Sequence, residues 1–177
     1  MLDKLKDRVL NCAIRKQSPR KVLFQNYKDI KTVLVLYESD FQEQNAVIKR
    51  LRDELVHDGK EVVLLGYADK KNIISLVLPI SRIIGRKQVN LFEKPTEEVI
   101  QFMQQNQYDL LLDLTLHPCR PLHYAALYAR AAFKTGLDMT KGIHDFMIAT
   151  HEQSSPVFLF EQIIRYLKMI NSKPYIK

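Results

Sequence analysis

The sequence predicts an α/β fold of three layers, in which helices cover both faces of a doubly wound, mostly parallel, Rossmann-like sheet. Three observations predict it. The runs at 32–37 and 108–114 are almost continuously apolar, which is typical of parallel strands buried on both faces. Segments with helical periodicity alternate with the strands. The 177 residues, 46% of them hydrophobic, suit a globular protein that buries its own core. We therefore expect a single α/β domain over 32–177, preceded by a basic N-terminal helix and arm over 1–31.

The net charge of +7 is concentrated in the N-terminal arm. Residues 1–31 contain nine lysines and arginines against three aspartates, whereas 32–177 contains 18 basic against 17 acidic residues. Such an arm can bind nucleic acid, an anionic membrane surface or an acidic protein partner. It can equally be a solvated surface that keeps the protein soluble. The sequence leaves these alternatives open.

The arm begins with a predicted amphipathic helix that ends near Pro19. One side of its helical wheel is apolar, formed by Leu2, Leu5, Val9, Cys12 and Ala13. The opposite side is polar, formed by Lys4, Arg8, Asn11 and Arg15. We expect the apolar side to pack on the protein's own domain. Binding to a membrane surface is the alternative, although the apolar side has no Trp or Phe to anchor it there.

A strand-helix-strand unit begins the domain, with a helix at 41–57 between strands at 32–37 and 60–67. Ser39 or Asp40 can cap this helix by accepting hydrogen bonds from its free N–H groups. The alternation then continues through the second half of the chain. We expect, in order, a helix capped by Thr96 and ending near 105, a strand at 108–114, a loop at 117–121, a helix at 122–132, a short strand or turn at 133–137, a strand at 145–149 and a helix at 157–170.

The segment 68–95 lies between these halves and has the least regular pattern. Its apolar run at 73–80 contains Pro79, which cannot donate to a sheet. The residues at 89–92 are expected to form a short edge strand.

A binding crevice is expected where the strand order reverses, because ligands of such sheets bind beyond the carboxyl ends of the strands at that point. If the strand order is 3-2-1-4-5, this crevice lies between the strands at 32–37 and 110–114. The candidate ligand-binding residues on its two sides are Ser39, Asp40, Thr115, His117, Arg120 and His123.

The expected ligand carries both anionic and hydroxyl groups, as a phosphosugar or nucleotide does. Two helix N-termini, near 40 and 121, favour an anion, and Arg120 adds a charge suited to phosphate or carboxylate. Asp40 would repel a bare anion. We expect Arg120→Ala to weaken binding and, if Arg120 is exposed, to leave folding nearly unchanged.

The densest polar cluster spans 113–123, and three interpretations of it are open. Its carboxylate, imidazoles and thiol are groups that bind zinc. Cys119 could act as a nucleophile activated by His117 or His123. The simplest interpretation is loop and helix-cap polarity. No dinucleotide-binding, P-loop or paired-cysteine motif occurs. We expect no cofactor and no metal ion, and the sequence assigns no catalytic residue.

Two resemblances add to this interpretation. The segment 108–137, with Tyr108-Asp109-x-x-x-Asp113-Leu114, Arg120, Arg130-Ala131-Ala132 and Lys134-x-Gly136, resembles the N-terminal Rossmann-like domain of heptosyltransferase-type glycosyltransferases. The whole chain resembles a family of small bacterial α/β proteins without an assigned function. That resemblance is carried by Asp69-Lys70-Lys71, Asn90 before Pro95, the Tyr108–Leu114 strand and Asp145-Phe-Met-Ile. In the glycosyltransferases the nucleotide-sugar site is in a second domain, and Asp40 is the nearest match to their acid-base carboxylate.

Two functional hypotheses follow. The first is a non-catalytic binding or interaction module. The alternative is a glycosyltransferase-like enzyme or subunit that acts on a phosphosugar or nucleotide-sugar, with its donor domain missing from this chain. We expect the protein to be cytoplasmic, because the start of the chain has no apolar core for a signal peptide and no apolar run approaches the length of a transmembrane segment. Cys12 and Cys119 are then expected to be reduced.

Overall fold

A computed structural model describes residues 2–39, 42–69, 81–139, 142–149 and 155–169. Within them the chain forms a six-stranded sheet in the order β3-β2-β1-β4-β5-β6, and every strand pair is parallel. The strands are β1 (Thr32–Glu38), β2 (Glu61–Ala68), β3 (Ser81–Gly85), β4 (Gln107–Asp113), β5 (Arg130–Leu137) and β6 (Phe146–Ile148). The doubly wound parallel sheet predicted from the sequence is confirmed.

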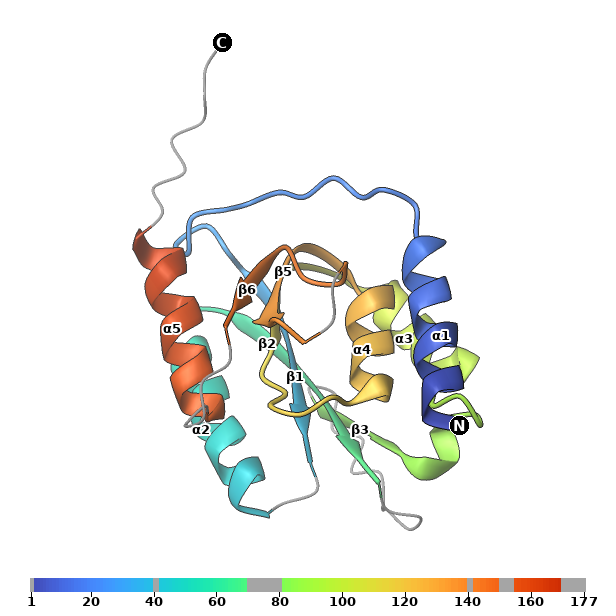
Figure 1. Ribbon diagram of the computed structural model, residues 1–177. Helices are drawn as coiled ribbons and strands as arrows, with labels where there is room; N and C mark the ends of the chain where they lie inside the picture. Colours follow the sequence, from blue (N-terminus) through green and yellow to red (C-terminus); the bar gives the residue numbers. More distant parts are fainter. Residues whose placement is uncertain (1, 40–41, 70–80, 140–141, 150–154, 170–177) are drawn as a thin grey trace.

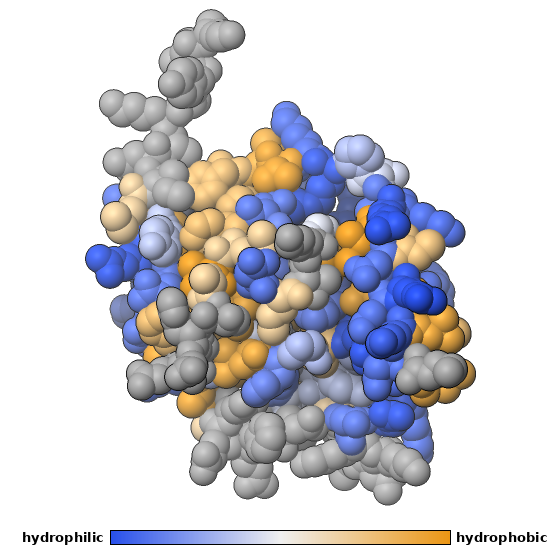
Figure 2. Space-filling model, viewed as in Figure 1, coloured by the Kyte–Doolittle hydropathy of each residue, from blue (hydrophilic) through white to orange (hydrophobic). Residues whose placement is uncertain are grey.

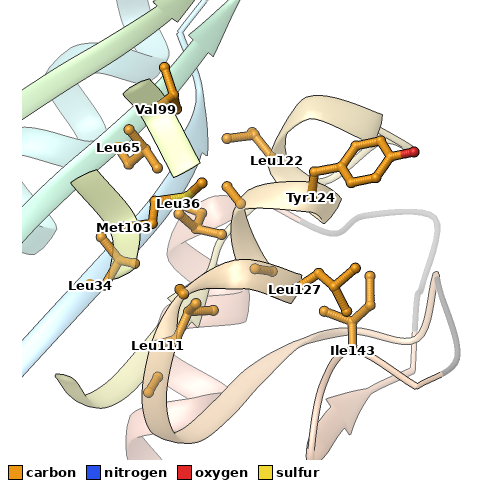
Figure 3. Packing of buried hydrophobic residues seen from close by; sticks show 14 of the residues in the cluster. Leu34, Leu36, Leu65, Val99, Met103, Leu111, Leu122, Tyr124, Leu127 and Ile143 are labelled. Atoms are coloured by element: carbon orange, nitrogen blue, oxygen red, sulfur yellow. The ribbon is translucent and has the colours of Figure 1, made fainter. Parts of the chain in front are cut away.

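Five described α-helices cover the sheet, and they lie on both of its faces (Figure 1). They are α1 (Leu2–Arg15), α2 (Gln42–His57), α3 (Glu97–Gln105), α4 (Arg120–Tyr128) and α5 (Pro156–Met169). The helices α2 and α5 pack on one face, and α1, α3 and α4 pack on the other. On the second face Leu36 and Leu111 of the sheet meet Met103 of α3 and Leu122 of α4 (Figure 3). The carboxyl ends of these parallel strands meet at one edge of the sheet, and the site lies there.

Two elements differ from the sequence prediction. The helix expected at 122–132 covers only 120–128, and Arg130–Leu137 is an eight-residue strand. The chain leaves the helix at Ala129, which has extended backbone angles, and the segment 130–135 then pairs with β4. The edge strand expected at 89–92 is also wrong, because Val89 makes only an isolated bridge to Pro95 around a turn. The apolar run at 73–80 lies outside the described residues.

The helix α1 forms where it was predicted, but it is rotated about its axis. Its most buried residues are Lys6 and Leu10, whereas Leu2, Leu5 and Cys12 of the predicted packing side are exposed. The rotation has an electrostatic cause, since Lys6 binds Glu93 and both Asp3 and Asp7 bind Arg120. These ion pairs turn the charged side of the helix toward the body of the protein.

Both cysteines are free thiols in the structure. In the described part of the chain, no helix has the length and apolar character needed to cross a membrane.

Candidate functional site

The strand order reverses between β1 and β4, so the expected ligand crevice lies at their carboxyl ends. Glu38 is the last residue of β1, and Asp113 is the last residue of β4. Parallel pairing sets Leu36 of β1 opposite Asp113, so Glu38 extends two residues beyond this register. The helix α4 begins seven residues after β4, at Arg120. The polar groups of both segments therefore gather at one edge of the sheet.

Two of the six candidate residues are buried against the strand ends. Ser39 is buried, and its N–H donates a hydrogen bond to the Tyr67 carbonyl oxygen. Thr115 has no exposed surface, and both its N–H and its hydroxyl donate to Asp113 Oδ1. Both side chains therefore lie below the surface that a ligand would touch. A third candidate, Asp40, lies outside the described residues.

The two candidate histidines lie in opposite environments. The His117 side chain is 72% exposed, and its Nδ1 lies 3.2 Å from Glu38 Oε2. His123 of α4 is buried, and burial lowers its pKa despite the nearby charge of Asp113. His117 therefore borders the open edge of the sheet, whereas His123 faces the interior beneath α1 and keeps its imidazole neutral at physiological pH.

Arg120 is enclosed by carboxylates. Its Nε donates to Asp7 Oδ1 at 2.8 Å and its Nη1 to Glu93 Oε2 at 3.0 Å, while Asp3 lies at 3.4 Å. The hydrogen bond to Asp7 is the main reason that the pKa of Arg120 is raised. An unchanged fold in Arg120→Ala was expected only if Arg120 is exposed. Its side chain is only 20% exposed, so that expectation does not apply. Removing this guanidinium would take away the ion-pair partner of Asp3 and Asp7 in α1 as well as a contact to any ligand.

A small polar pocket opens at the carboxyl ends of β1 and β2, beside the start of α4. We call it the strand-end pocket. Its volume is about 290 Å³, and its charged and hydroxyl-bearing lining residues are Glu38, Tyr67, Asp69, Arg86, Glu93 and Arg120. Three carboxylates and two guanidinium groups thus face one cavity. A second cavity of about 560 Å³ lies between α1 and the start of α4, on the side where Asp7, Asn11 and His123 are found.

Sequence reasoning missed Asp69, Arg86 and Glu93. Arg86 Nη1 donates to Asp69 Oδ1 at 3.0 Å, and both side chains are about half exposed. Asp69 follows the strand that the sequence predicted at 60–67, so the rule that parallel strands end at one edge could have found it. Glu93 has φ of 61°, a conformation unusual for a non-glycine residue, and only the folded chain shows that Lys6 and Arg120 hold it there.

A buried carboxylate–imidazole pair lies beneath this edge. Asp113 Oδ2 and His144 Nε2 are 3.0 Å apart, and each side chain is 1% exposed. Burial disfavours the charged carboxylate, but the hydrogen bonds from His144 and Thr115 outweigh it and lower the pKa of Asp113. Gly136 makes room for the ring, since a Cβ there would lie 2.8 Å from His144 Nε2. The pair is closed to solvent and joins β4 to the segment before β6.

The structure gives little support to the catalytic and metal interpretations of the 113–123 cluster. Burial raises the pKa of the Cys119 thiol to about 12, so it stays protonated, whereas a nucleophilic cysteine needs a lowered pKa. Across the described residues, no group of three His, Cys, Asp or Glu side chains is arranged to hold a metal ion. Loop polarity is the interpretation that the geometry fits best, although the N-cap residue Cys119 makes no side-chain hydrogen bond to the start of α4.

Thiol chemistry provides a direct check of this interpretation. We expect a disulfide-exchange reagent at neutral pH to label Cys12 rapidly and Cys119 far more slowly, because Cys12 is exposed and Cys119 is a partly buried, protonated thiol. The reaction is followed by the absorbance of the released thiol, with Cys12→Ser as the control that should remove the rapid phase. Rapid labelling of Cys119 in Cys12→Ser would restore the nucleophile interpretation.

The fold and this site define an α/β protein of the Rossmann-like class with a mixed-charge pocket at the strand ends. The chain belongs to DUF6913, a family of unknown function, whose model matches residues 4–170. No curated protein and no solved structure matches the chain. The resemblance of 108–137 to glycosyltransferases therefore gains no support from known proteins.

Proposed function

We propose that this protein is a non-catalytic binding module, and that its strand-end pocket takes a hydroxyl-rich small molecule with an anionic group, such as a phosphosugar or a nucleotide. The observation that carries the proposal is the mixture of charges in one small cavity. Three carboxylates can accept hydrogen bonds from ligand hydroxyls, while two guanidinium groups can donate to phosphate or carboxylate. The pocket also borders the strand-order reversal, since Glu38 ends β1 and Arg120 follows β4, and this position supports the same conclusion.

The two arginines of the pocket differ in how far they are already paired. Arg120 is shared among three carboxylates, so a ligand anion would have to compete with Asp7 and Glu93 for it. Arg86 is 50% exposed and pairs with Asp69. We therefore place the anionic group of the ligand at Arg86, where its guanidinium is accessible from solvent.

The hydroxyl groups of the ligand belong on the opposite side of the pocket, near Glu38. This carboxylate is 16% exposed and has His117 as its partner at the open edge. A volume of about 290 Å³ is near the lower end of the range for small-molecule sites. That size suits a monosaccharide phosphate or a mononucleotide better than a dinucleotide.

Binding without catalysis is favoured because the reactive groups near the pocket are constrained. Cys119 stays protonated, and Asp113 and His144 are sealed from solvent. The glycosyltransferase-like alternative depends on Asp40, which lies outside the described residues, and stays a prediction from the sequence. Release of nucleotide from a sugar nucleotide by the purified chain would favour that alternative over a binding module.

Arg86→Gln is the variant that tests the ligand pocket. We expect the affinity for ribose phosphate or a mononucleotide to fall about tenfold or more, because a charged hydrogen bond to the ligand is lost. The measurement is a calorimetric titration, with unphosphorylated ribose as the comparison ligand. Arg50→Gln is the matched control, since it removes the same charge from the exposed surface of α2. Equal affinities of Arg86→Gln and the unchanged protein would refute the placement of the anion.

A further inference from the structure

The helix α1 carries an apolar stripe that the rest of the described chain does not cover. Leu2 is 48% exposed and Leu5 46% exposed, Val9 is half-buried, and Cys12 is exposed. Their spacing of three, four and three residues is that of the core positions of a coiled coil. A surface helix normally turns such a stripe inward. In α1 the stripe instead lies on a side of the helix that faces solvent.

Specific contacts hold the stripe in this position. Lys6 binds Glu93 from the buried side of α1, and Asp7 binds Arg120. Leu10 packs beside Lys6 in the core that α1 shares with α3 and α4. These anchors set the rotation of the helix, so the stripe faces solvent as part of the folded structure.

The surface beside the stripe is positively charged. Arg8 and Arg15 lie at the heptad positions that flank one edge of the stripe, toward the polar side of the helical wheel, and Lys4 lies farther round that side. All three side chains are exposed, and none of them forms an ion pair with any described residue. The aspartates of the helix, Asp3 and Asp7, are directed to Arg120 instead. Figure 2 shows hydrophilic and apolar residues side by side on the side of the molecule where α1 lies. The unpaired charge next to the stripe is therefore entirely basic.

We infer that this flank of α1 is a docking surface for an acidic amphipathic helix of another protein. The heptad spacing suits the side chains of a second helix, and Arg8 and Arg15 along one edge of the stripe complement acidic residues of that helix. A second copy of this chain would bring like charges together. A lipid surface would find neither Trp nor Phe in the stripe. The occupant that fits both the spacing and the charge is an acidic helix.

The test uses the full chain and a synthetic helical peptide of about three heptads, with leucine at the core positions and glutamate at the flanking ones. We expect fluorescence anisotropy to show binding at least about tenfold tighter than that of a peptide with lysine at the flanking positions. The affinity should fall as salt is added, because the flanking charges are exposed. Leu5→Asp should weaken binding by about tenfold or more. Val22→Asp, at another apolar residue that is 48% exposed, is the matched control and should have no effect.

Four results would overturn the inference. Equal binding of the two peptides, or none, would exclude charge-selected helix docking. Unchanged binding by Leu5→Asp would place the contact away from the stripe. Sedimentation of the chain alone as a dimer that Leu5→Asp dissociates would assign the stripe to self-association. The chain could instead co-sediment with anionic phospholipid vesicles and bind no peptide. If Leu5→Asp abolished that co-sedimentation, the stripe would be assigned to a membrane surface.

Discussion

Replacing Asp113 by alanine should lower the free energy of unfolding by about 3–5 kcal/mol, because it leaves three buried hydrogen-bond donors without their acceptor. Asp113 accepts hydrogen bonds from His144 and from both the N–H and the hydroxyl of Thr115. All three donors are buried, and none can reach water without local opening. Because the pKa of Asp113 is lowered in the folded protein, its carboxylate stabilises the fold fully at pH values above the pKa of an unfolded aspartate. This contribution to the free energy of unfolding is lost on acidification.

Chemical denaturation of the purified variants measures this effect. Asp138→Ala is the matched control, since Asp138 is exposed just after β5 and should change stability by less than about 0.5 kcal/mol. If Asp113→Ala cost no more than Asp138→Ala, the buried pair would not stabilise the fold.

Lys134→Met should destabilise the protein more at high pH than at neutral pH. Lys134 is buried in β5, and its Nζ donates to the carbonyl oxygens of Ala126 and Leu127 in the last turn of α4. Burial, aided by the charge of Arg20, lowers its pKa to about 8. A neutral amine still has two N–H groups for these two acceptors, so deprotonation keeps both bonds.

The sign of the pH dependence follows from this lowered pKa. Between about pH 8 and pH 10.5 the unfolded chain binds a proton at Lys134 that the folded chain lacks, so the lysine supports folding more strongly as the pH rises. The cost of Lys134→Met should therefore increase by about 2 kcal/mol between pH 7.5 and pH 9.5. Urea unfolding of both proteins at the two pH values measures it. Lys87→Met removes an exposed lysine and is the control. A cost that falls with pH would contradict a neutral buried amine.

The strands at the centre of the sheet could be predicted from the sequence, because strands that are buried on both faces consist mainly of apolar residues. β1 and β4 are apolar runs, and their alternation with helices predicted a doubly wound sheet, for which the order 3-2-1-4-5 was assumed. β5 could not be predicted in the same way. Its first half, Arg130–Phe133, continues an alanine-rich helical sequence, and its extended form depends on pairing with β4. Tertiary pairing overrides local helix propensity there.

The edge of the sheet that carries the site could also be predicted, but the partners of its side chains could not. Arg120 was expected to offer its charge to a ligand, whereas Asp7 and Glu93 occupy it from 113 and 27 residues away. The same distant contacts set the rotation of α1. His144 meets Asp113 across 31 residues. Such pairings depend on how the layers stack, which no local spacing in the sequence encodes.

The most direct test of the binding module is a map of where a ligand contacts the folded chain. Ribose phosphate is titrated into the isotope-labelled protein, and backbone amide shifts are followed by NMR. We expect concentration-dependent shifts at the strand-end pocket, at Glu38, Asp69, Arg86 and Glu93, and none along α2, with saturation that Arg86→Gln weakens. Shifts confined to other parts of the chain, or no shifts at millimolar ribose phosphate or mononucleotide, would contradict the proposed function.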